Sequence, residues 1–176
     1  SFKEPHFFDT DTNWYNGRDW YEKSYFSGLE SKKSIGEFTP SYLGSKICVS
    51  RIKETLASDV KFIVLLRNPI DRAYSHYLHT KRDEYEKLSF LDSLEKEEER
   101  LKGYKSDNDD ISFTRFCYKY SGMYALHLKS YLSKFDENQF CIVLFDDFVN
   151  KREEVIKRIL TFLDVDLNVS LNIDVK

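Results

Sequence analysis

Two short apolar runs stand out along the chain, and polar residues follow each of them at once. Residues 62–66 (FIVLL) and 140–145 (FCIVLF) are continuous apolar stretches in an otherwise mixed sequence. Runs of this kind are typical of strands buried on both faces, as in a parallel sheet covered by helices. A further short strand is predicted over residues 34–38, because Pro40 forces a break just after them. These strands and the helical segments between them predict a three-layer α/β domain.

Helical character recurs between the predicted strands. The predicted helices cover residues 45–56, 89–101, 113–135 and 150–163, with an interruption near Ser121-Gly122 in the third. The expected solvated face of the second helix consists of Glu95, Glu97, Glu98 and Glu99. Residues 102–112 have the composition of a loop. Trp14, Tyr21 and Tyr25 approximate a helical spacing, and such aromatic residues are expected to belong to the core.

The stretch from Lys61 to Tyr77 joins a predicted strand to a predicted helix. The apolar run stops at Arg67, Asn68 can cap the helix, and Pro69 can be its first residue. The polar residues that helical spacing places on one face are Arg72, Ser75, His76 and His79. Ligands of open α/β sheets bind beyond the carboxyl ends of the strands, and a helix N-terminus beside an arginine favours phosphate. The alternative is an ordinary surface arginine followed by the solvated side of a helix.

The opening segment, SFKEPHFFD, mixes ionisable and aromatic residues. In an extended conformation Glu4, His6 and Phe8 would project to one side, and Pro5 and Phe7 to the other. A carboxylate beside an imidazole, flanked by aromatic rings, is the arrangement that a general base needs. The alternative is a structural ion pair at the start of a strand.

Composition mainly excludes functions. With 176 residues, 41% hydrophobic and 16% aromatic, the chain is expected to fold as a single domain over 1–176. The net charge of −3 gives no general attraction to nucleic acid or to an anionic membrane. Cys48, Cys117 and Cys141 are unclustered, so neither a disulfide framework nor a metal site is predicted. No apolar run approaches the length of a membrane span, and a soluble, cytoplasmic protein is expected.

Several motifs resemble, in the same order, those of the sulfotransferases that act on heparan sulfate and of related bacterial sulfotransferases. The segments that carry the resemblance are K-E-P-H-F-F-D, G-E-F-T-P-S-Y-L, R-N-P-I-D-R-A-Y-S-H-Y, Y-S-G-M-Y-A-L-H-L-K-S-Y-L-S-K-F and I-V-L-F-D-D-F. They extend over essentially the whole chain. The resemblance implies the sulfotransferase fold, a P-loop-like parallel sheet flanked by helices and here trimmed at its N-terminus.

The resemblance also implies an activity. A sulfotransferase moves the sulfuryl group of 3′-phosphoadenosine 5′-phosphosulfate (PAPS) to a hydroxyl or amine of a small-molecule or glycan acceptor, releases 3′-phosphoadenosine 5′-phosphate (PAP), and needs no metal. Two alternatives remain at this point. A P-loop-type nucleotide kinase would also have an anion site between a strand and a helix, and an inactive glycan-binding module could keep the same fold.

Site residues follow from the resemblance by position. Glu4 would be the base, with His6 and Asp9 in support. Arg67 and Ser75, eight residues apart, would hold the 3′-phosphate of the donor, and Tyr124 would lie near the nucleotide.

Two departures from the family pattern affect these expectations. Phe38 stands where many glycosaminoglycan sulfotransferases have lysine, which argues against an acidic, heparan-like acceptor. The glycine-rich loop and lysine that surround the 5′-phosphosulfate are expected before Ser1, and a second glycine-rich loop after Lys176, and neither is in this sequence. The chain is therefore expected to be a trimmed core that binds the donor weakly on its own, or a protein that does not bind it normally.

Overall fold

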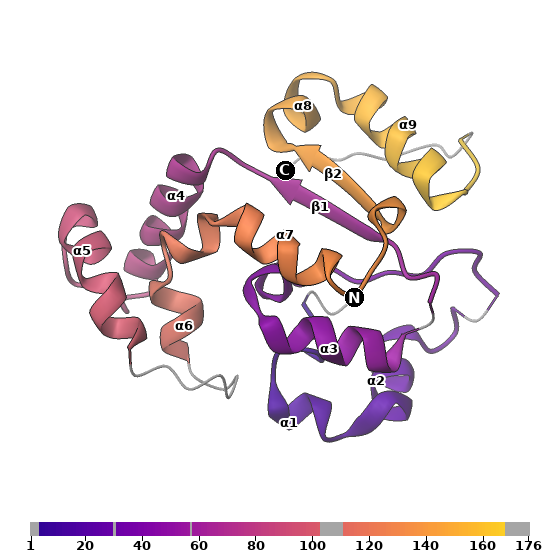
Figure 1. The fold of residues 1–176 in the computed structure, drawn as a ribbon, viewed down its shortest axis with the longest axis horizontal. Helices are drawn as coiled ribbons and strands as arrows, with labels where there is room; N and C mark the ends of the chain where they lie inside the picture. The colour runs from indigo at the N-terminus through magenta and orange to yellow at the C-terminus, as the bar shows by residue number, and fades with distance from the viewer. Residues whose placement is uncertain (1–3, 30, 57, 103–110, 168–176) are drawn as a thin grey trace.

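The computed structural model describes residues 4–29, 31–56, 58–102 and 111–167 (Figure 1). The elements, in chain order, are α1 (Asp11–Trp14), α2 (Gly17–Phe26), the 3-10 helix η1 (Pro40–Gly44), α3 (Lys46–Thr55), β1 (Phe62–Leu66), α4 (Pro69–Arg82), α5 (Phe90–Leu101), α6 (Ile111–Phe116), η2 (Tyr120–Gly122), α7 (Tyr124–Leu132), η3 (Glu137–Gln139), β2 (Phe140–Leu144), α8 (Phe145–Asn150) and α9 (Arg152–Leu163). Most of the loop expected over residues 102–112 lies outside the described residues.

The sheet within the described residues consists of β1 and β2. They pair in parallel, from Phe62 opposite Phe140 to Leu66 opposite Leu144, so both apolar runs are confirmed as strands. The strand predicted over 34–38 is wrong, because those residues join no ladder in the described part of the chain. The segment is instead exposed, with Phe38 67% accessible, and it ends at a proline that has no N–H to offer a neighbouring strand.

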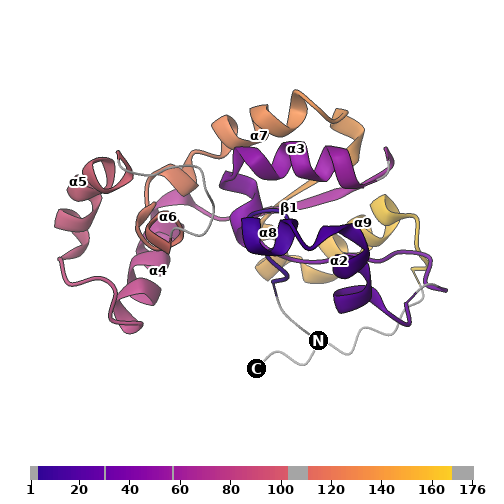
Figure 2. The same cartoon turned by 90° about the horizontal axis from the view of Figure 1, so that it is seen from below.

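Helices lie on the two faces of this sheet, as Figures 1 and 2 show, but they cover each face only in part. The expected burial of the strands on both faces is therefore wrong for the side chains that stay exposed, which are Ile63, Leu65, Ile142 and Leu144. On one face, Phe62 packs against Phe140 and against Phe135, which follows α7, with ring centroids 4.8 Å apart in both cases. On the other face, Cys141 and Val143 pack with Val155 of α9. The chain therefore has the layered α/β architecture that its hydrophobic pattern predicts.

Aromatic side chains of the N-terminal segment form a large part of the main core. Phe7 and Phe8 are almost fully buried, and the ring of Phe7 stacks on that of Tyr21 with centroids 4.2 Å apart. Trp14 packs against the same cluster. These contacts confirm the expected structural role of the aromatic residues, and they anchor residues 4–9 to the domain.

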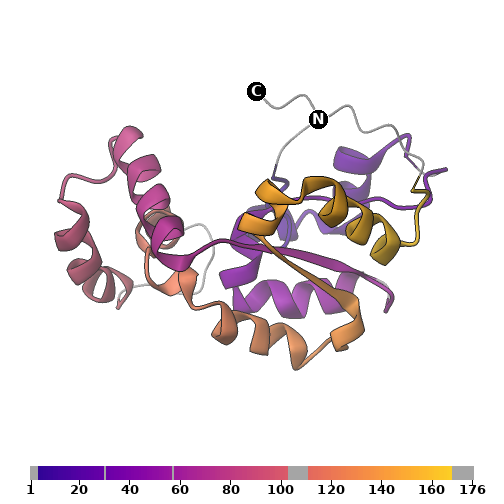
Figure 3. The same cartoon turned by 90° about the horizontal axis from the view of Figure 1, so that it is seen from above.

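The helices α4, α5 and α6 gather at one end of the molecule (Figure 3). A buried carboxylate joins them, because Glu86 accepts hydrogen bonds from Arg100 at 2.6 and 3.0 Å and from the Tyr118 hydroxyl at 3.0 Å. Burial alone would raise the pKa of Glu86, but the hydrogen bonds and the charge of Arg100 lower it to about 2. The ion pair is therefore maintained across the physiological pH range.

Glu97 corrects the expectation of a fully solvated acidic face on α5. Its side chain is buried, and it accepts hydrogen bonds from the backbone N–H groups of Lys119 and Tyr120 at 2.6 and 2.7 Å. Lys119 is the N-cap of η2 and Tyr120 is its first residue, so the N–H groups of both would otherwise lack helical partners. Composition alone did not distinguish Glu97 from its exposed neighbours, because its partners lie far along the chain.

Asn68 caps α4 as the sequence predicts. Its side chain accepts a hydrogen bond from the backbone N–H of Ile70 at 2.9 Å, and Pro69 occupies the first turn. Replacing Asn68 with alanine is expected to lower the free energy of unfolding by about 1 kcal/mol, because the cap hydrogen bond is lost. Asn68→Ser keeps a capping oxygen and serves as the matched control in urea denaturation. Equal stability of the two variants would show that the cap contributes nothing.

Candidate active site

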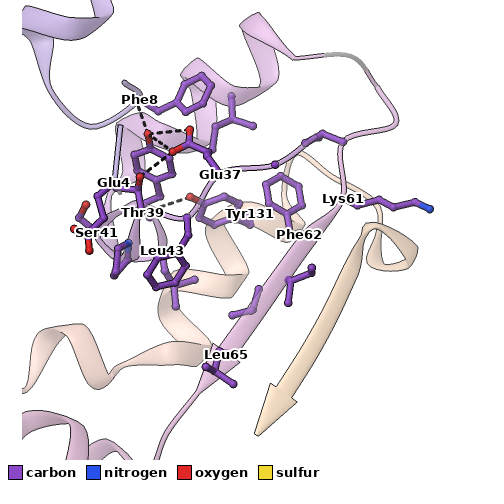
Figure 4. Close-up of a pocket in the computed structure, with 18 of the residues that line it drawn as sticks. Glu4, Phe8, Glu37, Thr39, Ser41, Leu43, Lys61, Phe62, Leu65 and Tyr131 are labelled. Atoms are coloured by element: carbon purple, nitrogen blue, oxygen red, sulfur yellow. Dashed lines mark hydrogen bonds between the residues drawn. The ribbon is translucent and has the colours of Figure 1, made fainter. Parts of the chain in front are cut away.

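One groove of about 2040 Å³ connects the N-terminal segment to the carboxyl end of β1. Its walls come from Glu4 and His6, from η1, from β1 and from one face of α4. Figure 4 shows Glu4 and Ser41 at one end of this groove, with Leu65 of β1 farther along it. The structure thus brings the two regions that the sequence singled out to the same cavity.

Glu4, His6 and Asp9 form a continuous line of contacts. The Nε2 atom of His6 lies 3.5 Å from Oε2 of Glu4, and its Nδ1 atom lies 2.8 Å from Oδ2 of Asp9. The Thr10 hydroxyl donates to the backbone carbonyl of His6 at 2.5 Å, and the side chain of Asn13 donates to the same carbonyl at 3.1 Å. Several bonds therefore fix the segment that carries the imidazole.

The backbone of this segment differs from the extended conformation expected of it. Glu4 and His6 have φ angles of 60° and 49°, in the left-handed region that residues with a side chain seldom adopt. The predicted alternation of sides is therefore wrong, and Phe7 and Phe8 are both buried. Glu4 and His6 are nevertheless close to each other, as predicted, because the backbone turns at these residues. Strained backbone of this kind is held in place by the surrounding contacts and is concentrated at functional sites.

The hydrogen bond to Asp9 determines which nitrogen of His6 faces Glu4. A carboxylate can only accept, so Nδ1 carries a proton and Nε2 points toward Glu4. This bond, opposed by partial burial and assisted by the charges of Asp9 and Glu4, raises the pKa of His6 above its usual 6.5. Only the doubly protonated ring can donate to Glu4, so the Glu4–His6 contact requires the imidazolium.

Asp9 is the buried member of the line, with 7% of its surface accessible. Its Oδ2 atom accepts from His6 and also from the hydroxyl of Ser41 in η1. Its Oδ1 atom is buried and has no hydrogen-bond partner among the described residues. Reasoning from sequence missed Ser41, because nothing local links it to a residue 32 positions earlier.

A second polar group holds the backbone of the N-terminal segment. The hydroxyl of Tyr42 accepts from the N–H groups of Phe7 and Phe8 at 3.0 and 3.3 Å, and it lies 3.2 Å from a carboxylate oxygen of Glu37. Burial raises the pKa of Glu37, although hydroxyl donors, Tyr21 first among them, oppose the shift. Figure 4 shows Glu37 and Thr39 beside each other within this hydrogen-bonded group. Glu37 is therefore a structural acceptor at the wall of the groove.

Arg67 lies directly beyond β1, exposed, where the chain turns into α4. Its guanidinium carbon is 5.3 Å from the ring centroid of Phe145 at the start of α8. The hydroxyl of Tyr124 donates to the backbone carbonyl of Arg67 at 2.9 Å. Tyr124 and Arg67 are thus neighbours, and both line the groove.

The polar face of α4 is only partly directed into the groove. Arg72, His76 and His79 line it, whereas Ser75 is exposed and is not among the lining residues. Arg72 donates to the carbonyl of Tyr118, and His76 contacts the carbonyl of Thr114 at 2.8 Å. Burial, together with the positive charge of Arg72, lowers the pKa of His76 to about 4, so this histidine is neutral at physiological pH. A joint role of Arg67 and Ser75 stays a prediction.

Taken together, the groove has a carboxylate and imidazole at one end and cationic groups at the other. The exposed Arg67 beside the first turn of α4 suits a phosphate, because a guanidinium and helix N–H groups both favour an anion.

Among the described residues, no group of three or more histidine, cysteine or acidic side chains is placed to hold a metal ion. In the same part of the chain, no helix is long and apolar enough to cross a membrane.

Comparison with known proteins gives a consistent result. The family profile of the sulfotransferase domain matches residues 1–174. The chain is 29% identical over 160 residues to heparan sulfate glucosamine 3-O-sulfotransferase 3A1 of Mus musculus, covering 91% of this chain and 37% of that protein. Over 64 residues it is 41% identical to the membrane-associated sulfotransferase kil1 of Dictyostelium discoideum, covering 35% of this chain and 13% of that protein.

A solved structure extends the likeness to the fold. The crystal structure of a sulfotransferase from Alicyclobacillus acidocaldarius superimposes with a TM-score of 0.81 at 31% sequence identity, covering 99% of this chain and 73% of that one. The chain spans less than half the length of the curated relatives named above.

Proposed function

Because this chain belongs to the sulfotransferase family, we propose that it transfers a sulfuryl group from PAPS to a hydroxyl or amine of an acceptor. The observation that carries the proposal is the groove in which Glu4 and His6 share walls with Arg67. A base and an anion site facing one cavity are what this transfer requires. The same family membership favours this reaction over that of a nucleotide kinase.

The donor would be held by the groups around the start of α4. Within the described part of the chain the guanidinium of Arg67 contacts the ring of Phe145 and forms no ion pair, so it can turn toward a phosphate. Tyr124 would support it by holding the Arg67 carbonyl. Ser75 would require the ligand to reach over the outer face of α4, since its side chain is exposed. When bound, the donor supplies the sulfuryl group and leaves as PAP.

Glu4 is assigned the proton-accepting role. Its carboxylate is 41% exposed in the groove, so an acceptor hydroxyl can reach it. As the acceptor oxygen forms its bond to sulfur, the hydroxyl proton moves to an oxygen of Glu4, and the bond between sulfur and the bridging oxygen of the donor breaks. General-base help of this kind contributes roughly 10²–10⁴ in rate.

His6 would orient the base. Its imidazolium, fixed by Asp9, donates from Nε2 toward Oε2 of Glu4 and selects one carboxylate rotamer. The cation also stabilises the ionised form of Glu4 before the transfer. Asp9 would act through His6, because its carboxylate is buried behind the imidazole.

Two observations bear on the class of acceptor. The named relatives include enzymes whose name specifies a heparan sulfate glucosamine as acceptor, which supports a glycan. Phe38 is 67% exposed and lines the groove, so the wall there presents an aromatic face instead of a cation. We therefore propose a small-molecule or glycan acceptor that offers an apolar face to Phe38, with less dependence on acidic groups.

The direct test is formation of PAP from PAPS in the presence of a panel of sugar and phenol acceptors, followed by mass spectrometry of the products. A mass increase of one sulfuryl group on an acceptor is expected, and ATP in place of PAPS should give no transfer. Phosphorylated acceptor with ATP would contradict the proposal.

The raised pKa of His6 predicts a pH dependence. Since the imidazolium orients Glu4, turnover is expected to fall as pH rises through the pKa of His6, which lies above 6.5. The stability that its contacts with Asp9 and Glu4 provide has the same sign: it is fully present below pH 6.5 and is lost as pH rises through the raised value. Turnover measured between pH 5 and 9 checks this. The His6→Gln variant should lack this alkaline limb, and an unchanged limb in that variant would assign it to another group.

A further inference from the structure

Ser41 shares an acceptor atom with His6. Its hydroxyl donates to Oδ2 of Asp9, the same oxygen that receives Nδ1–H of His6 at 2.8 Å. The other oxygen, Oδ1, is buried without a hydrogen-bond partner among the described residues. Among the described residues, the side-chain hydrogen bonds of this buried carboxylate therefore end on one oxygen atom, which two donors share.

We propose that Ser41 is a positioning residue which, through Asp9, sets the pH range in which His6 carries a positive charge. The inference rests on the proposed function, in which the charged imidazole orients Glu4. Ser41 acts on His6 indirectly, because its hydroxyl donates its hydrogen bond to Asp9 and not to His6 or Glu4.

The Ser41 hydroxyl is expected to lower the pKa of His6. A donor on a carboxylate spreads its negative charge and weakens its attraction for any other donor on the same atom. Without the Ser41 hydroxyl, His6 would be the remaining donor to Oδ2 in the described part of the chain and would bind it more strongly. Its second proton would then be held more tightly, so His6 would stay charged to a higher pH.

The position of Ser41 is fixed by the elements around it. Ser41 belongs to η1, whose first residue is Pro40, and the next residue, Tyr42, binds the N–H groups of Phe7 and Phe8. Residues of η1 therefore bind the N-terminal segment through its backbone N–H groups and also through the Asp9 side chain. Two attachments at adjacent residues hold the serine in register with Asp9.

Other ionisable groups near this cluster do not change between the variants proposed below. On its own segment His6 faces Glu4 and Asp9. The charged or titratable groups that neighbouring elements direct toward Asp9 and its surroundings are Glu37, Tyr42, Cys48, Arg51 and Tyr131. Since all of them remain in place when Ser41 is altered, a shift in the His6 titration reports on the serine hydroxyl.

The experiment is an NMR titration of the His6 imidazole in the full-length protein, which needs neither donor nor acceptor. In Ser41→Ala the His6 pKa is expected to rise by about half a unit or more, equivalent to roughly threefold tighter proton binding. Ser41→Thr keeps a hydroxyl and should restore the original titration. Ser45→Ala removes a hydroxyl just after the same turn, at the N-terminus of α3, and should leave His6 unchanged.

Turnover provides the second readout. The alkaline limb of the pH profile should move upward in Ser41→Ala by the same amount as the NMR titration, while PAP affinity stays constant. An unshifted His6 titration in Ser41→Ala, with Glu4→Gln inactive, would overturn the role of Ser41 and leave the proposed function intact. A shifted titration with an active Glu4→Gln enzyme would uphold the link from Ser41 to His6 and overturn the assignment of Glu4.

Discussion

Replacing Glu4 with glutamine is expected to lower turnover by about 10²–10⁴-fold. Glutamine keeps the size of the side chain and can still hydrogen-bond, but it cannot take a proton from the acceptor. The affinity for PAP should change less than about threefold, which is under 1 kcal/mol. Single-turnover kinetics and calorimetry on the full-length protein separate the two effects, since Glu4 is placed for chemistry and not for donor binding.

His6→Gln is the matched comparison for this change. It is expected to lower turnover less than Glu4→Gln, because His6 orients the base and is itself bound to Asp9. An active Glu4→Gln enzyme together with an inactive His6→Gln enzyme would reverse the roles and make the imidazole the base. Equal loss of nucleotide affinity in both variants would point to disruption of the N-terminal segment instead.

Replacing Arg67 with alanine is expected to weaken binding of PAP at least tenfold while scarcely affecting AMP. A charge-assisted hydrogen bond contributes about 1.5–3 kcal/mol, and AMP lacks the 3′-phosphate that would receive it. Arg67 suits this role better than Arg72, whose side chain already donates to the Tyr118 carbonyl and is partly buried. Isothermal titration of both nucleotides measures the difference directly.

The control for Arg67 is Arg82→Ala, on the last turn of α4 and not among the residues that line the groove. It removes an equal charge and should leave both affinities unchanged. Ser75→Ala isolates the predicted partner of Arg67, and a loss of PAP affinity in that variant would support a ligand that bridges the outer face of α4. Equal affinity of the unmodified protein for PAP and AMP would remove the basis for a 3′-phosphate site.

Features set by neighbouring residues were predictable from the sequence. The two strands follow from unbroken apolar runs, and the start of α4 follows from Asn68 and Pro69, whose effects are confined to a single turn. The place of Arg67 at the end of a strand could also be anticipated, whereas a shared groove for Glu4 and Arg67 followed only from the family resemblance.

Features set by distant partners were not predictable. Glu97 resembles the other glutamates of α5 in sequence, yet it is buried because two amides far along the chain need an acceptor. The role of Ser41 could not be predicted for the same reason, because its hydrogen-bond partner Asp9 lies 32 residues earlier in the chain. The segment around residues 34–38 has strand character but lacks a neighbouring strand in the described chain, and pairing, not composition, makes a strand.

The parallel pairing of β1 with β2 has a consequence for the order in which the molecule assembles. The whole stretch from Arg67 to Gln139 lies between the two strands, so their ladder can form only when that long loop closes. Loop closure carries an entropic penalty that increases with length, and distant pairings are made slowly. The contacts that hold α4 to α6 together, such as those of Tyr118 with Arg72 and Glu86, all lie within this stretch and join residues closer in sequence than the paired strands are. The anion end of the groove can therefore acquire its local structure before the sheet that supports it is complete.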